Sequence, residues 1–216
     1  MRIQLSEHFT YKKLLQFVLP SIVMMIFTSI YSVVDGLFVS NYVGKTAFSA
    51  LNLIYPLLMG LGALGFMIGT GGSAVIAIAL GEQRKEDANR YFSMLIFATV
   101  FGGIFLSTIG LIWIRPIANL MGATPALMPN CLTYGRILLI SLTAFMLQNV
   151  FQSFFVTAEK PKLGLAITVI AGVTNFILDF LLIVVFDLGI AGAAAATALS
   201  QTVGALFPVF YFIRKN

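Results

Sequence analysis

Acidic and amide side chains occur inside long apolar segments of this sequence, where ionisable groups are rare. The run at 163–186 is apolar almost throughout, yet it carries Asn175 and Asp179. Their four-residue spacing places both side chains on one face of a helix. A carboxylate in hydrocarbon is costly unless it faces a partner or a water-filled cavity. These two residues are therefore candidates for a functional site.

Two further polar side chains are expected at a similar depth. Counted from the same end of each apolar run, Asp35, Asp179 and Thr197 all lie about 12–15 Å below one membrane surface, at about 1.5 Å per residue. Asn175 lies one turn deeper. Scattered, merely tolerated polar residues would not be expected to share one level.

Such a set of oxygen atoms suits a small cation or a proton. Na+ and similar hard cations take carboxylate, amide and hydroxyl oxygens. Because two carboxylates in one apolar pocket cannot both ionise at low cost, Asp35 and Asp179 favour either a bound proton or a cation between them. The alternative is that Asp179 only bonds Asn175 or a neighbouring helix and so contributes to packing.

The composition predicts an all-α, polytopic membrane protein. The chain has 216 residues, of which 59% are hydrophobic and only 10% charged, whereas soluble domains carry about 25% charged residues. The net charge of +5 does not indicate a nucleic-acid partner, because the basic residues sit in short loops between apolar runs. Cys131 is the only cysteine, which excludes an intrachain disulfide and a CxxC metal pair.

Charged and turn residues divide the chain into six apolar spans. They run at about 14–43, 47–80, 91–114, 132–158, 163–186 and 190–213. The expected domains are an amino-terminal segment at 1–13, a six-span transmembrane lobe at 14–213 and a short polar end at 214–216.

The basic residues then predict the orientation, because cytoplasmic loops carry the excess of Lys and Arg. With the amino terminus inside, ten of the 13 fall on the cytoplasmic side: Arg2, Lys12, Lys13, Arg84, Lys85, Arg90, Lys160, Lys162, Arg214 and Lys215. Three fall outside: Lys45, Arg115 and Arg136. Both termini are therefore expected in the cytoplasm.

Four segments resemble the multidrug and toxic compound extrusion (MATE) transporters. They are 19–21 (LPS), 34–39 (VDGLFV), 81–88 (GEQRKEDA) and 158–162 (AEKPK). Asn175, Asp179 and Thr197 also match the cation site in the amino-terminal lobe of prokaryotic members, and Asp35 completes it. The resemblance covers the whole chain.

The resemblance implies a cation-coupled antiporter of a prokaryotic inner membrane. H+ or Na+ would be the coupling ion, with no other cofactor, and Na+ would bind at the four matched residues. The exported substrates would be drugs or other amphiphilic organic cations, which implies a part in antibiotic resistance. Pro20 would be a helix kink that responds to protonation of Asp35, although interior prolines also kink membrane helices without any switch.

The family has two six-helix lobes, and this chain matches the first of them. Residues 214–216 would begin the cytoplasmic linker between lobes. The second lobe would be either a missing carboxy-terminal half or a second copy of this chain, since the halves of such folds are structural repeats.

Other polar and flexible side chains are candidates for a substrate cavity. Gln148, Asn149 and Gln152 are three amides in an apolar span that need partners. Met24 is a candidate for an adaptable substrate contact, although such residues more often face lipid or the core.

The sequence leaves two alternative functions, and one further motif needs an explanation. A lipid-linked oligosaccharide flippase of the same superfamily would line its cavity with Arg and Lys, but only Arg136 lies within a span. A non-transporting membrane assembly subunit is the second alternative. The GxGxxG pattern at 60–65 lies inside an uncharged span, which favours helix packing over nucleotide binding. No nucleophile–base pair occurs in the spans, so an enzyme is not expected.

Overall fold

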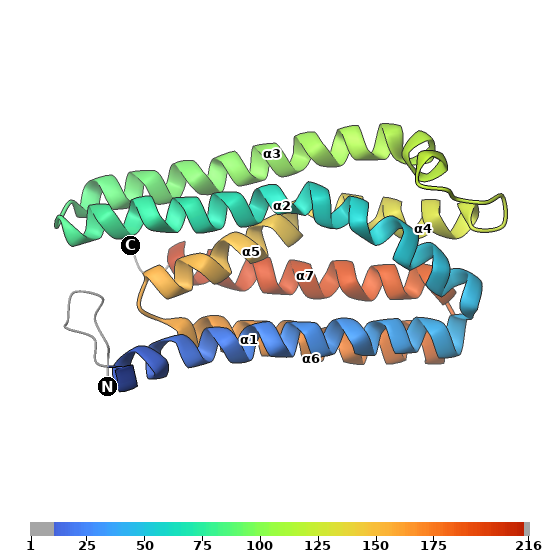
Figure 1. Ribbon diagram of the computed structural model, residues 1–216, viewed down its shortest axis with the longest axis horizontal. Helices are drawn as coiled ribbons and strands as arrows, with labels where there is room; N and C mark the ends of the chain where they lie inside the picture. Colours follow the sequence, from blue (N-terminus) through green and yellow to red (C-terminus); the bar gives the residue numbers. More distant parts are fainter. Residues whose placement is uncertain (1–10, 214–216) are drawn as a thin grey trace.

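The computed structural model describes residues 11–213, which form a bundle of long antiparallel helices (Figure 1). Residues 1–10 of the predicted amino-terminal segment at 1–13 lie outside the described residues, as does the predicted segment at 214–216. The elements, in chain order, are α1 (Tyr11–Phe38), the π-helix η1 (Val39–Val43), α2 (Lys45–Gly81), α3 (Lys85–Leu120), α4 (Met128–Ile140), α5 (Leu142–Thr157), α6 (Pro161–Asp179), the π-helix η2 (Phe180–Val185) and α7 (Gly189–Ile213).

These elements confirm the all-α, six-span prediction. Five helical segments of the described chain are long and apolar enough to cross a membrane, and the bent pair formed by α4 and α5 makes a sixth when it counts as one span. Local signals mark several helix boundaries. α4 and α6 carry proline in their first turn, where the missing N–H has no helical partner to lose. Gly44, at φ +110°, separates η1 from α2 in a conformation that glycine adopts easily.

The helices form layers, with α2 and α3 on one side and α1 and α6 on the other (Figure 1). α5 and α7 lie between the two layers, where α5 packs on α2 and α7 packs on α6. α1 packs mainly along α6 rather than along α2, its neighbour in the chain. α1 begins and α7 ends at the same end of the bundle. We call this the proximal end, which is the predicted cytoplasmic end, and the opposite end the distal end.

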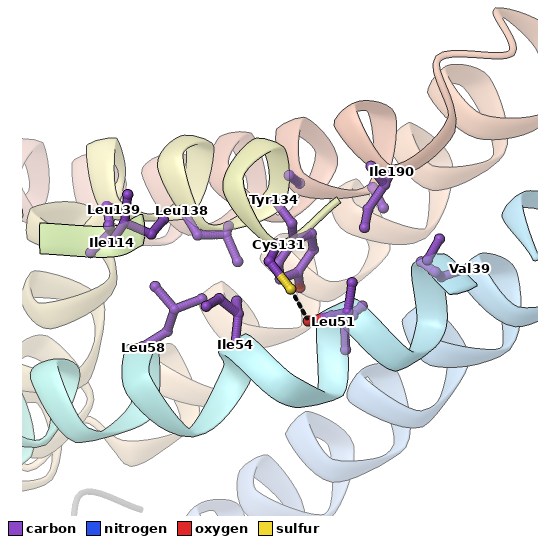
Figure 2. Close-up of a cluster of buried hydrophobic side chains, with 14 of the residues drawn as sticks. Val39, Leu51, Ile54, Leu58, Ile114, Cys131, Tyr134, Leu138, Leu139 and Ile190 are labelled. Atoms are coloured by element: carbon purple, nitrogen blue, oxygen red, sulfur yellow. Dashed lines mark hydrogen bonds between the residues drawn. The ribbon is translucent and has the colours of Figure 1, made fainter. Parts of the chain in front are cut away.

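The largest apolar core lies toward the distal end, where α2 faces α4 and the start of α7 (Figure 2). Its fully buried side chains include Ile54, Ile114, Tyr134 and Leu139. Cys131 is buried in the same cluster, and its Sγ lies 3.8 Å from the backbone oxygen of Ala50. This core fixes α4 against α2 on one side of the predicted ion site.

Small residues let α2 approach α5. A Cβ atom at Gly65 would lie 2.8 Å from the Cα of Met146, and one at Gly69 would lie 3.0 Å from the Cα of Val150. The GxGxxG pattern therefore lies inside a helix. Its Gly65 faces the Met146 backbone and its Gly62 faces the Phe145 ring, as close packing in a membrane requires.

Two spans differ from their predicted limits. α3 continues through Pro116 to Leu120, because a membrane helix tolerates a proline whose lost hydrogen bond is compensated locally. The fourth span bends by 53° between α4 and α5. At this bend the Ser141 hydroxyl faces the backbone oxygen of Leu138 at 3.1 Å, and such bonds to the preceding turn often bend helices.

Both acid-bearing helices end in π-helical turns that the sequence pattern did not indicate. η1 follows α1 shortly after Asp35, and η2 begins at the residue after Asp179. The two turns contact each other and α7 at the distal end. π-Helical turns are rare and occur frequently at functional sites.

The close approach of α2 to α5 predicts a position-specific loss of stability. Gly65→Leu should lower the free energy of unfolding by about 1–3 kcal/mol or more, since its side chain would overlap the Met146 backbone. Gly71→Leu is the matched control, because a Cβ there meets no atom within 4 Å. Thermal unfolding of both variants in detergent measures the difference, and equal melting temperatures would contradict this packing.

Candidate ion-binding site

Three helices bring the four predicted residues into the distal half of the bundle. Asp35 comes from α1, Asn175 and Asp179 come from α6, and Thr197 comes from α7. Their exposed fractions are 9%, 2%, 0% and 9% respectively. α6 packs against both α1 and α7, so the carboxyl, amide and hydroxyl groups converge inside the lobe.

The two carboxyl groups are direct neighbours. Asp35 and Asp179 lie within hydrogen-bonding range of each other. Two carboxylates have no proton to donate, and accordingly Oδ1 of Asp35 and both carboxyl oxygens of Asp179 have no hydrogen-bond partner in the described chain. A single proton between them would supply the missing bond. Two bare charges at this separation would repel strongly in a buried site.

The neutral members of the set are also unsatisfied. Nδ2 of Asn175 and Oγ1 of Thr197 are buried without a hydrogen-bond partner among the described residues. An unpaired buried polar group costs about 1–3 kcal/mol, and native proteins rarely leave several of them together. Carboxyl, amide and hydroxyl oxygens are the ligand types that suit Na+, so the residues present fit either a proton or a hard cation.

A small cavity adjoins the acids. Asp35 and Thr197 line it together with Tyr31, Ser32, Tyr55, Leu58, Met59, Tyr134, Leu138, Leu142, Phe145 and Gln201. Its volume is about 40 Å³, which is room for two or three waters or a small cation at about 10–15 Å³ each. A pocket for a drug-sized ligand needs about 300 Å³ or more. The volume of this cavity therefore suits a small ion and is too small for a drug.

Two residues that line this cavity were not predicted as site residues, although their helical spacing from predicted ones could have indicated them. Tyr31 lies four residues before Asp35, and Gln201 lies four residues after Thr197. Each pair therefore shares one helix face. Tyr134 comes from α4, a different helix from any of the predicted residues, so spacing along the chain carried no signal for it.

The remaining predicted residues lie apart from the acid pair. Pro20 is buried within α1, which is α-helical through it. Met24 is only 7% exposed, and Asn149 on α5 is only 6% exposed. Gln148 and Gln152 are half-buried on α5. The predicted kink at Pro20 and the predicted substrate contacts stay predictions.

Comparisons with known proteins agree with this architecture. The MatE family model matches residues 20–181. The multidrug export protein MepA of Staphylococcus saprophyticus is 27% identical over 206 residues, which cover 95% of this chain and 46% of that protein. MepA of Staphylococcus haemolyticus is 27% identical over 98% of this chain and 47% of its own length.

Solved structures of MATE transporters also match this chain over about half of their own length. A MATE transporter in its bent conformation matches with a TM-score of 0.87 and 26% identity, over 95% of this chain and 46% of that one. An outward-facing multidrug resistance MATE transporter of the MOP superfamily matches with a TM-score of 0.88 and 26% identity, over 97% and 49%.

The chain thus spans about half the length of the curated relatives that it matches. The family model covers most of the described helices, and the acid pair lies where three of those helices converge. The protein is accordingly no enzyme but a membrane protein of the multidrug and toxic compound extrusion (MATE) family.

Proposed function

We propose that this chain forms one lobe of a cation-coupled exporter of drugs or other amphiphilic organic cations, and that Asp35, Asn175, Asp179 and Thr197 hold its coupling ion, H+ or Na+. The observation that carries the proposal is the buried pair of neighbouring carboxyl groups from α1 and α6. Oδ1 of Asp35 and both carboxyl oxygens of Asp179 lack hydrogen-bond partners among the described residues. A packing role alone would be expected to satisfy these groups within the protein.

Neutralisation of the acid pair would drive the conformational change. Two charged carboxyls repel each other and attract water, whereas a proton or Na+ between them removes the repulsion. α1 packs mainly along α6, so a change in the Asp35–Asp179 separation acts directly on the contact that fixes α1. This two-state contact, biased by the ion, would couple ion entry to alternating access.

A second lobe is expected to cover the face between α1 and α2. A cleft of about 350 Å³ separates these helices, and Ser32, Asn52 and Tyr55 are exposed polar residues that line it. Polar side chains at membrane depth normally face protein or a water-filled cavity. The partner would be a carboxy-terminal half or a second copy of this chain, and substrate would pass between the two lobes.

The expected location is the inner membrane of a prokaryote, with the proximal end in the cytoplasm. The basic residues favour this orientation. The flippase alternative gains no support from the cleft between α1 and α2, because none of the residues that line it is Lys or Arg.

The first prediction concerns Asp179. Asp179→Asn should abolish ion-driven efflux, a loss of about tenfold or more, because the amide cannot take up a proton or neutralise a cation. Dye efflux from cells that express the protein with its second lobe measures this. Asp187→Asn is the matched control, since Asp187 is exposed in the loop before α7. Unchanged efflux in Asp179→Asn, with normal membrane insertion, would exclude the coupling role.

The second prediction separates transport from the assembly-subunit alternative. Replacement of both Asp35 and Asp179 by Leu should leave stability unchanged or raise it by about 1–4 kcal/mol, as for other buried charged pairs replaced by apolar residues. The same variant should lose all ion-driven efflux. Thermal unfolding and dye efflux measured on one preparation test this. A double variant that is at least as stable as the parent and keeps the phenotype of cells that express the parent would favour the assembly-subunit alternative.

The third prediction identifies the ion. If Na+ binds, it should raise the free energy of unfolding of the purified chain, by about 2.7 kcal/mol at a hundredfold excess over its Kd. Acidification should remove the effect, because protons compete for the same carboxylates, and Asp179→Asn should abolish it. Thermal unfolding in NaCl against KCl measures the shift. If Na+ does not change the unfolding temperature and efflux follows a proton gradient, the coupling ion is H+. Efflux that depends on neither ion would contradict ion coupling.

A further inference from the structure

Polar side chains continue from the acid site toward the proximal end, inside an otherwise apolar bundle. They come from the bend before α5, from α5 itself, from α6 and from α7. We call them the polar column: Ser141, Gln148, Asn149, Gln152, Thr168 and Gln201.

The column begins at the cavity beside the acids. Gln201 lines this cavity together with Asp35 and Thr197. On its other side, Oε1 of Gln201 lies 3.3 Å from the hydroxyl of Ser141, at the bend between α4 and α5. Gln201 therefore connects the ion site with the start of α5.

The next step passes along α5. Gln148 fills the space at Gly204 of α7, where a Cβ atom would lie 2.9 Å from the Gln148 side-chain amide. Gln152 lies one turn further toward the proximal end. Its Nε2 donates to Oγ1 of Thr168 on α6 at 3.5 Å, and the Thr168 hydroxyl donates in turn to Gly164 O at 3.0 Å.

Among the residues of the polar column, Asn149 gives the evidence for bound water. It is 6% exposed, and its Nδ2 has no hydrogen-bond partner among the described residues. A buried amide left dry costs about 1–3 kcal/mol, and buried water commonly supplies the missing bonds. If the column served only as packing between helices, this amide would be expected to reach a neighbouring helix.

A cluster of aromatic rings lies toward the proximal end of the bundle, where α3, α5 and α7 meet. Phe92 of α3, Phe151 and Phe155 of α5 and Phe212 of α7 lie in contact, with ring centroids 5.0 to 6.4 Å apart. Phe92 and Phe212 also line a cavity of about 170 Å³ at the proximal end, where Asn89 and Thr157 are polar lining residues. Phe92 and Phe212 thus belong both to the ring cluster and to the wall of this cavity.

We propose that the polar column is a hydrated path inside this lobe, by which the coupling ion passes between the acid pair and the proximal face, and that the Phe92 ring cluster closes it. This inference rests on the proposed ion site, because the acid pair is the end point of the path. Asp35 also lines the cleft between α1 and α2, so the column would be a second route from the acid pair, directed toward the proximal face.

Cysteine labelling tests the hydration. Cys131 is the chain's only cysteine, so Cys131→Ser gives a cysteine-free background for single cysteines at Asn149 and Val150. Val150 is the matched control, because it is fully buried on the same helix and faces α2 near Gly69. In nanodiscs, 2-aminoethyl methanethiosulfonate, a water-soluble cation, should modify Asn149→Cys about tenfold faster than Val150→Cys, since only a hydrated thiol ionises and reacts readily.

The ring cluster is tested in the same background. Phe92→Ala should speed modification of Asn149→Cys when the reagent is added from the proximal side of proteoliposomes. Phe101→Ala on the same helix is the control, because Phe101 is 77% exposed, and it should change nothing. Equal rates at Asn149→Cys and Val150→Cys, in both the parent and Phe92→Ala backgrounds, would overturn the path. Labelling needs no transport, so this failure is distinguishable from loss of the ion site, which the Asp179→Asn efflux measurement reports.

Discussion

The contact between Asp35 and Asp179 is the constraint on which the rest of this structure depends. Each carboxyl group is buried, and each comes from a different helix. If both are charged, their Coulomb repulsion in a low-dielectric site exceeds the stabilisation that an ordinary packing contact provides. We propose that a proton or cation neutralises the pair. The α1–α6 contact would then respond to ions in a way that apolar packing does not.

The other helices hold this contact in place. α2 approaches α5 through glycines whose Cβ positions would meet a neighbouring backbone, which fixes one side of the bundle without any polar group. The distal apolar core fixes α4 against α2 (Figure 2). α1 has no comparable support, since it packs mainly along α6. In the proposed mechanism, α2, α4 and α5 would therefore stay fixed while α1 responds to the ion.

Polar groups are divided between two faces of the lobe with different surroundings. Ser32, Asn52 and Tyr55 are exposed beside the cleft between α1 and α2, where a second lobe and substrate would lie. The polar column is largely enclosed. The two sets meet at Asp35, which lines both the 40 Å³ cavity and the cleft. In the proposed function, the acid pair would therefore lie between the substrate cleft and the polar column.

Length and hydropathy alone determined the helical spans, because a membrane segment must satisfy its own backbone hydrogen bonds. Counting residues from the helix ends also placed Asp35, Asp179 and Thr197 at one depth, since the rise of a helix is constant. Only the tertiary structure decided which faces meet. The contact between the two π-helical turns and the approach of Tyr134 to the acids depend on helices far apart in the chain, and no local period in the sequence encodes such contacts.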